Sequence, residues 1–150
     1  MKNILIKISL LCICILILTG CGKHTNKCTK VDEHKDYTVE EKYNIYSKND
    51  IVYKVEEIKI IKTRNNTIRE YIEKQLDNNF LYNSNEYGGY TKSVNKTKET
   101  LTYKVTIDYK KIDLKKFTNA NSLERDKSKK KGIETSKIKK MYEMISAKCE

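Results

Sequence analysis

The sequence predicts an α+β domain, an antiparallel sheet of about four strands with two helices packed on one of its faces. Apolar and polar residues alternate strictly over 101–109, as they do in a half-buried strand. Apolar residues in 67–82 and 135–147 recur at helical spacing instead. Each pattern has a single apolar side, so the helices and the sheet can bury these sides against each other.

The first strands are predicted to form a hairpin. Residues 37–45 alternate with period two, and the turn-forming sequence 47–50 separates them from a second strand over 51–62. In that second strand, Tyr53 and Val55 share one side, whereas Ile58 and Ile60 share the other. We expect a β-bulge near the Glu56-Glu57 pair to bring both sets to one face.

The first helix is predicted over 67–82. Thr67 and Glu70 have the spacing of a capping box at its start. The apolar side of this helix consists of Ile68, Ile72, Leu76 and Phe80. A loop with Gly88 and Gly89 follows and leads into a second hairpin, 90–94 with 101–109.

The C-terminal part is expected to add one short and one long helical segment. Ile112, Leu114 and Phe117 predict a single helical turn against the sheet edge. The last helix, 135–147, has an apolar stripe that Cys149 would extend. The stripe consists of Ile138, Met141, Tyr142 and Ile145. The lysine-rich run 127–131 is expected to be a solvated loop, with contact to an anionic surface as the alternative.

The N-terminus has the features of a secretory signal. Lys2 and Lys7 supply a positive N-terminal region, and the apolar run that follows to Leu18 is too short to span a bilayer. The run ends in the motif Leu18-Thr19-Gly20-Cys21. This motif resembles the lipobox of bacterial lipoproteins, which implies diacylglyceryl attachment to the Cys21 thiol and cleavage after residue 20. Two acyl chains are sufficient for stable anchoring.

The charge and composition narrow the list of partners. The formal net charge is +11, but an exported protein meets little nucleic acid, so we expect no nucleic-acid partner. Anionic lipid headgroups or cell-wall polymers are the expected charged neighbours. The lysine-rich, proline-free composition is typical of an AT-rich genome and fits a Gram-positive host. Residues 21–36 are polar and are predicted to form a flexible tether from the membrane to a single domain, 37–150.

The cysteines are expected to have three different roles, in the signal, in lipid attachment and in a disulfide bond. Cys12 and Cys14 lie in the signal, and Cys21 takes the lipid. Cys28 and Cys149 remain, and in an exported protein they are predicted to form one disulfide. The alternatives are an intermolecular bridge and a metal site. The only histidines, His24 and His34, do not have the spacing of a zinc finger.

Several segments together resemble the YehR-like family of small bacterial lipoproteins. They are Tyr87-Gly88-Gly89-Tyr90, the strand Thr102-Tyr103-Lys104-Val105-Thr106-Ile107-Asp108-Tyr109 with Ile112-Asp113-Leu114, and Cys28 after Cys21. The resemblance covers most of the mature chain. It implies an α+β domain on a lipid anchor and brings no catalytic residues.

The functional prediction is a non-enzymatic protein on the extracytoplasmic face of the cell membrane, with no catalytic, cofactor or metal residues. The folded region lacks histidine, and adjacent acids on a strand point to opposite faces. The favoured hypothesis is a monomeric interaction module that contacts an envelope protein or an anionic cell-wall polymer through a sheet edge or its tyrosine-rich face. The alternatives are a small-ligand carrier with a pocket between sheet and helices and a carboxylate-based hydrolase.

Overall fold

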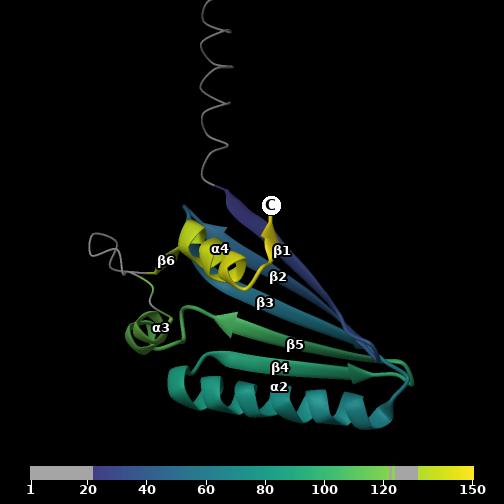
Figure 1. Ribbon diagram of the computed structural model, residues 1–150. Coiled ribbons are helices and arrows are strands. Elements are labelled where there is room, and N and C mark those ends of the chain that lie inside the picture. Colours follow the sequence, from purple (N-terminus) through teal and green to yellow (C-terminus); the bar gives the residue numbers. More distant parts are fainter. Residues whose placement is uncertain (1–21, 122, 124–131) are drawn as a thin grey trace, which may run out of the picture.

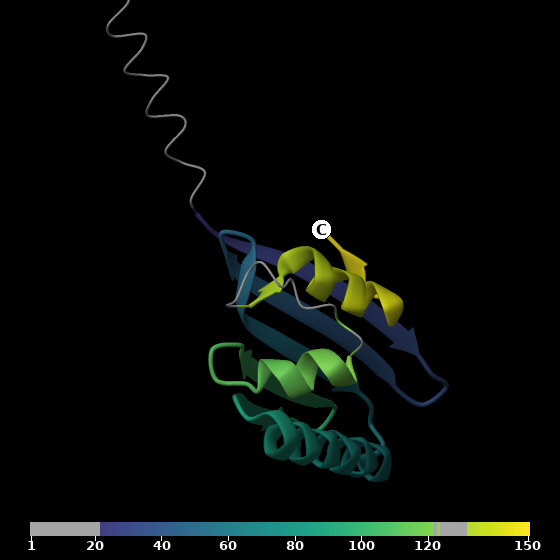
Figure 2. The ribbon, with the colours of Figure 1, turned by 90° about the vertical axis from the view of Figure 1, so that its left-hand side faces the viewer.

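The computed structural model describes residues 22–121, 123 and 132–150. They form an α+β fold in which one antiparallel sheet has three helices on one face (Figures 1 and 2). The expected signal 1–20, Cys21 and the lysine-rich run 127–131 lie outside the described residues. Within the described part, no helix has both the length and the apolarity to cross a bilayer.

The sheet has seven strands rather than about four, in the order β4-β5-β3-β2-β1-β7, with β6 paired to β3. The expected hairpins are β2 (Thr38–Lys48) with β3 (Ile51–Lys62) and β4 (Tyr90–Lys96) with β5 (Thr100–Asp108). Three strands were not expected: β1 (Lys23–Glu33), β6 (Ile133–Glu134) and β7 (Lys148–Cys149). β3 pairs with β5, which joins the two hairpins into one sheet.

The prediction of a flexible tether over 21–36 is wrong, because most of it is strand β1. β1 pairs with β2 along its whole length, from Lys23 opposite Lys48 to Glu33 opposite Thr38. The segment has little apolar side-chain surface, and Cys28 is its one fully buried residue. Backbone hydrogen bonds to the free edge of β2 therefore hold it, and these bonds do not depend on side-chain hydrophobicity.

The disulfide between Cys28 and Cys149 is formed within the chain. Its two residues lie directly opposite each other on β1 and β7, with their Cα atoms 4.0 Å apart. Cys149 does not extend the stripe of the last helix as expected, because α4 (Thr135–Met144) ends earlier and Ile145 is exposed. The chain then turns back and adds β7 to the sheet edge (Figure 1).

The expected bulge at Glu56-Glu57 is absent, and the irregularity lies at the start of β3 instead. The register of β2 with β3 shifts between Tyr46 and Ser47, where Tyr53 is the extra residue. From there, β3 alternates without interruption. Ile58 and Ile60 therefore lie on the face without helices, and Glu57 and Lys59 lie on the helix-covered face with the buried Val55 and Ile61.

The long helix α2 (Asn66–Tyr87) begins at a different cap from the one expected. The side chain of Asn65, not Thr67, is the N-cap, and its Oδ1 accepts hydrogen bonds from the Thr67 and Ile68 amides at 3.0 and 3.3 Å. The helix ends at Gly88, whose φ is 68°, and Gly89 follows with φ 70°. A Cβ on Gly89 would lie 2.9 Å from the Asp108 carbonyl oxygen, so this position requires glycine.

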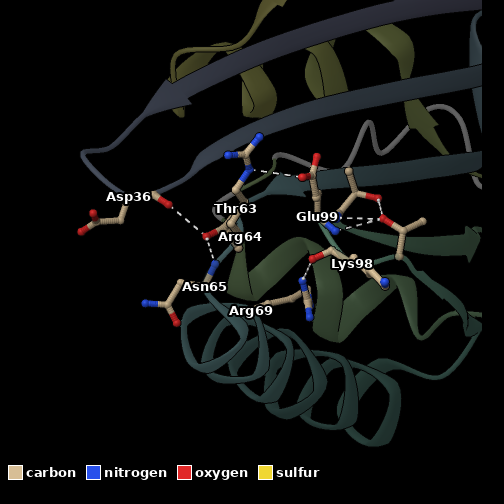
Figure 3. Close-up of polar contacts among 9 residues, drawn as sticks. Asp36, Thr63, Arg64, Asn65, Arg69, Lys98 and Glu99 are labelled. Atoms are coloured by element: carbon tan, nitrogen blue, oxygen red, sulfur yellow. Dashed lines mark hydrogen bonds and ion pairs between the residues drawn. The ribbon is translucent and has the colours of Figure 1, made fainter.

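Polar contacts fix the start of α2 against the end of the sheet (Figure 3). The Thr63 hydroxyl donates to the Asp36 carbonyl at 2.9 Å and accepts from the Asn65 amide at 3.1 Å. Arg69 Nη1 donates to the Lys98 carbonyl at 2.6 Å, in the turn between β4 and β5. α2 is therefore held over β4 and β5.

The other two helices, α3 (Leu114–Ala120) and α4, lie on the same face as α2 (Figure 2). The Asp113 side chain caps α3 by accepting from the amides of Lys115 and Lys116. α4 buries Ile138 and Tyr142, and the Tyr142 ring stacks on Tyr43 of β2 with centroids 4.1 Å apart. The core thus lies between the sheet and two separate helical covers, α4 over β1–β3 and α2 over β4–β5.

Candidate functional site

A cleft lies where these two helical covers fail to meet. It consists of two neighbouring cavities of about 220 and 190 Å³, and both are lined by Glu57, Asn83 and Tyr90. The larger cavity lies between α2 and the strands β3 and β5, and the smaller one continues toward α3 and α4. Glu57 of β3 therefore lies at the junction of the two cavities, and we call this site the Glu57 cleft.

Glu57 is an acid on the helix-covered face of the sheet. Its Oε1 accepts a hydrogen bond of 2.7 Å from the hydroxyl of Tyr142 on α4. Burial raises the pKa of the Glu57 carboxyl, because loss of hydration disfavours the charged form. The Tyr142 hydrogen bond and the charge of Lys59 partly oppose that rise, whereas the nearby Glu41 adds to it.

A second acid, Glu41 of β2, lies diagonally across from Glu57 on the same face. It is buried, with 8% of its surface exposed, and Lys59 Nζ donates to its Oε1 at 2.9 Å. The hydroxyl of Tyr43 donates to its other oxygen. Because these partners satisfy Glu41, Glu57 is the acid of this pair that is available to a ligand.

Tyr109 carries a buried hydroxyl without a partner. The residue is 3% exposed, and its hydroxyl is the one buried side-chain nitrogen or oxygen atom among the described residues that has no hydrogen bond. Burial raises the pKa of Tyr109, and the nearby hydroxyl of Tyr90 and carboxyl of Glu57 add to this rise. Tyr109 itself lines neither cavity of the cleft. Buried polar groups are normally paired, so an unpaired one is a sign of a binding site or a missing water.

The α2 side of the cleft is aromatic and neutral. Phe80, Asn79 and Asn83 face Tyr90 and Tyr103 across the larger cavity. The Tyr103 hydroxyl donates to Asp77 at 2.7 Å. Asp77 also pairs with Lys92, so this acid carries no unbalanced charge.

Two wider depressions occur elsewhere, but their linings are less suited to binding. One, of about 490 Å³, lies beside Tyr53 and Gly89, and none of its lining residues is buried. The other, of about 650 Å³, includes His24 and lies between the β2–β3 turn and α4.

The sequence predicts no site residue in this cleft, although a pocket between sheet and helices is among its alternatives. Adjacent acids on a strand are expected to point to opposite faces, and this holds within Glu40-Glu41 and within Glu56-Glu57. The sheet instead brings together Glu41 from one pair and Glu57 from the other. The signal was present in the sequence, since both acids occupy positions where the alternation expects an apolar residue.

The other acids considered in the sequence have structural roles. Asp108 lies 3.6 Å from Lys111 in a surface ion pair, and Asp113 caps α3. Among the described residues, no group of three or more His, Cys, Asp or Glu side chains could hold a metal ion.

Comparison with known proteins identifies the fold. No protein-family model matches the chain, and no curated protein matches it by sequence. The NMR structure of Escherichia coli YehR matches with a TM-score of 0.56 and 19% identity, covering 87% of this chain and 92% of YehR. An NMR structure of a Streptococcus pneumoniae TIGR4 protein matches with a TM-score of 0.48 and 11% identity, covering 87% of each chain. The chain therefore has a YehR-like fold.

Proposed function

We propose that the chain is a lipid-anchored, non-enzymatic binding protein on the extracytoplasmic face of a bacterial membrane, and that it binds a small ligand in the Glu57 cleft. The carrying observation is the position of the Glu57 carboxyl, which is half-buried at the junction of two cavities and keeps one oxygen that no described residue bonds. Pockets that combine an aromatic lining with a few such groups are typical of ligand sites.

The location rests on the sequence motif and the disulfide. Leu18-Thr19-Gly20-Cys21 resembles a lipobox, and a stable disulfide is typical of an oxidising compartment. Since β1 begins at Lys23, the sheet would start almost at the lipidated Cys21, which would hold the domain close to the membrane. The Cys21→Ala variant should lose labelling by an alkyne fatty acid in the native host, and labelling equal to wild type would contradict the anchor.

Ligand binding in the cleft can be tested by filling it. Asn83 lies on the wall shared by both cavities, so Asn83→Trp should block the site. Asn78→Trp is the matched control, because Asn78 is exposed on the same helix. A ligand-observed NMR screen of small organic molecules should yield binders that Asn83→Trp abolishes and Asn78→Trp retains. Binders that both variants retain, or an absence of binders, would contradict the proposal.

The open face of the sheet supports a second candidate, the interaction module. No helix covers this face (Figure 2), and its half-exposed Ile58 and Ile60 are surrounded by polar side chains. On it, Lys27 and Lys42 have no ion pair with any described residue, which suits an anionic cell-wall polymer. Lys42→Glu should then shorten retention on a poly(glycerol phosphate) column. Unchanged retention would remove this candidate.

A further inference from the structure

We propose that the Glu57 cleft selects a small organic molecule with a primary ammonium group, whose charge pairs with the Glu57 carboxylate. This inference rests on the proposed ligand-binding function and adds the chemical class of the ligand. It follows from the balance of charges in the cleft, from its hydrogen-bond acceptors and from its aromatic wall.

The balance of charges in the cleft is negative, although the whole chain is strongly basic. Two acids, Glu41 and Glu57, share this part of the covered face with one base, Lys59. Lys59 lines the larger cavity beside Glu57, but its Nζ is 2.9 Å from Glu41 Oε1, so Glu57 has no ion pair of its own among the described residues. A single acid in a site with low-dielectric walls focuses its field on the cavity and favours a positive ligand.

The other elements around Glu57 add no compensating charge. α2 contributes the neutral amides of Asn79 and Asn83, and α3 contributes Asn121. α4 contributes Met141 and the Tyr142 hydroxyl, which are also neutral. Lys92 lies over the rings of the aromatic wall, and its ammonium is paired with Asp77.

The acceptors in the cleft fit an ammonium with several N–H donors. Tyr142 occupies Glu57 Oε1, and no other hydrogen bond within the described residues reaches this carboxylate. The other oxygen of Glu57, Oε2, is therefore free to accept, and the side-chain amide of Asn83 lines both cavities beside it. A primary ammonium has three N–H donors and can bond this oxygen while its charge pairs with the carboxylate. A quaternary ammonium has no N–H donor and could form no hydrogen bond with Glu57.

The aromatic wall of the cleft already attracts an ammonium group of the chain itself. Lys92 Nζ lies 5.2 Å from the centre of the Phe80 ring and 5.9 Å from that of Tyr103. Both rings also line the larger cavity, where their faces can stabilise a second cation. Val105 and Leu76 leave room beside them for a short alkyl chain.

The test compares three probes of similar shape, n-butylammonium, 1-butanol and butyrate, on the full-length chain in detergent micelles by isothermal titration calorimetry and NMR. We expect n-butylammonium to bind, with shift changes at Asn83 and Tyr90, and to bind at least about tenfold more tightly than 1-butanol, because it alone gains a charge-assisted hydrogen bond. Glu57→Gln should weaken its binding by at least about tenfold and leave 1-butanol binding unchanged.

A further variant separates the role of Glu57 from general effects of mutation. Glu56→Gln is the matched control, because Glu56 lies on the open face and pairs with Lys54 and Lys104. It should bind n-butylammonium as wild type does.

Each outcome of this experiment has a definite meaning. If 1-butanol or butyrate binds in the cleft as tightly as n-butylammonium, the ammonium inference is overturned while the ligand-binding function stands. If no probe binds and no small molecule competes for the cleft, both are overturned. If Glu57→Gln does not fold, the comparison of n-butylammonium with 1-butanol on the wild-type chain still decides.

Discussion

Replacing tyrosine by phenylalanine should have opposite effects on stability at two neighbouring buried positions, Tyr109 and Tyr142. The substitution keeps the ring and removes one hydroxyl. Tyr142 donates its hydroxyl to Glu57 at 2.7 Å, whereas the Tyr109 hydroxyl has no partner. Both residues are almost fully buried. Because phenylalanine keeps the ring in place, neither variant loses much packing.

The expected magnitudes follow from the two hydrogen-bond states. Loss of a hydrogen bond to a charged group costs about 1.5–3 kcal/mol, so Tyr142→Phe should lower the free energy of unfolding by that amount. A buried hydroxyl without a partner carries a desolvation penalty of about 1–3 kcal/mol, so Tyr109→Phe should raise the free energy of unfolding by about 1 kcal/mol or more. In a domain of this size, about 1 kcal/mol corresponds to roughly 3–5 °C in Tm.

The assay is urea unfolding of the ligand-free protein followed by circular dichroism, with Tyr53→Phe as the control. Tyr53 is half-exposed near the start of β3, so its variant should stay within about 0.5 kcal/mol of wild type. A loss of stability in Tyr109→Phe equal to that in Tyr142→Phe would refute the reasoning, because it would show that the Tyr109 hydroxyl is satisfied.

The remaining predictions concern the disulfide, the hydrophobic core and the pH dependence of stability. Reducing the Cys28–Cys149 bond, which closes a separation of 121 residues, should lower the free energy of unfolding by up to about 5 kcal/mol, as measured by urea unfolding with and without reductant; a change below about 1 kcal/mol would contradict this. Ile107→Asp should unfold the domain, because Ile107 is 3% exposed and would become a buried unpaired charge, whereas Thr106→Asp on the open face should remain folded by circular dichroism. The pKa of Glu57 is raised above 4.5 in the folded state, so protonation of Glu57 favours folding. Wild type should therefore lose stability relative to Glu57→Gln as pH rises from about 4.5 through the raised pKa. Urea unfolding at several pH values measures this, and a constant difference between the two proteins would contradict it.

The sequence by itself determined the fold class and most of the regular elements. Alternation over 101–109 predicts β5, and the stripe Ile68, Ile72, Leu76 and Phe80 predicts α2, because side-chain period reflects which side of an element is buried. The pair Cys28 and Cys149 predicts the disulfide, since it remains once the cysteines of the expected signal and anchor are set aside. Side-chain period and the number of cysteines are properties of the sequence itself, and they can be read without knowing which residues contact each other in the fold.

Only the tertiary structure decided the extra strands and the cleft. β1 has too few apolar residues to be recognised as a strand from the sequence. Backbone hydrogen bonds to β2, rather than buried side chains, hold it in the sheet. Glu41 and Glu57 interrupt the apolar side of two separate strands, and strand register places them diagonally across from each other. The buried Glu41 and the half-buried Glu57 are tolerated because Lys59 and Tyr142, which come from different elements, supply hydrogen bonds to them. Such long-range pairing has no periodic signature along the chain, so the site became visible only in three dimensions.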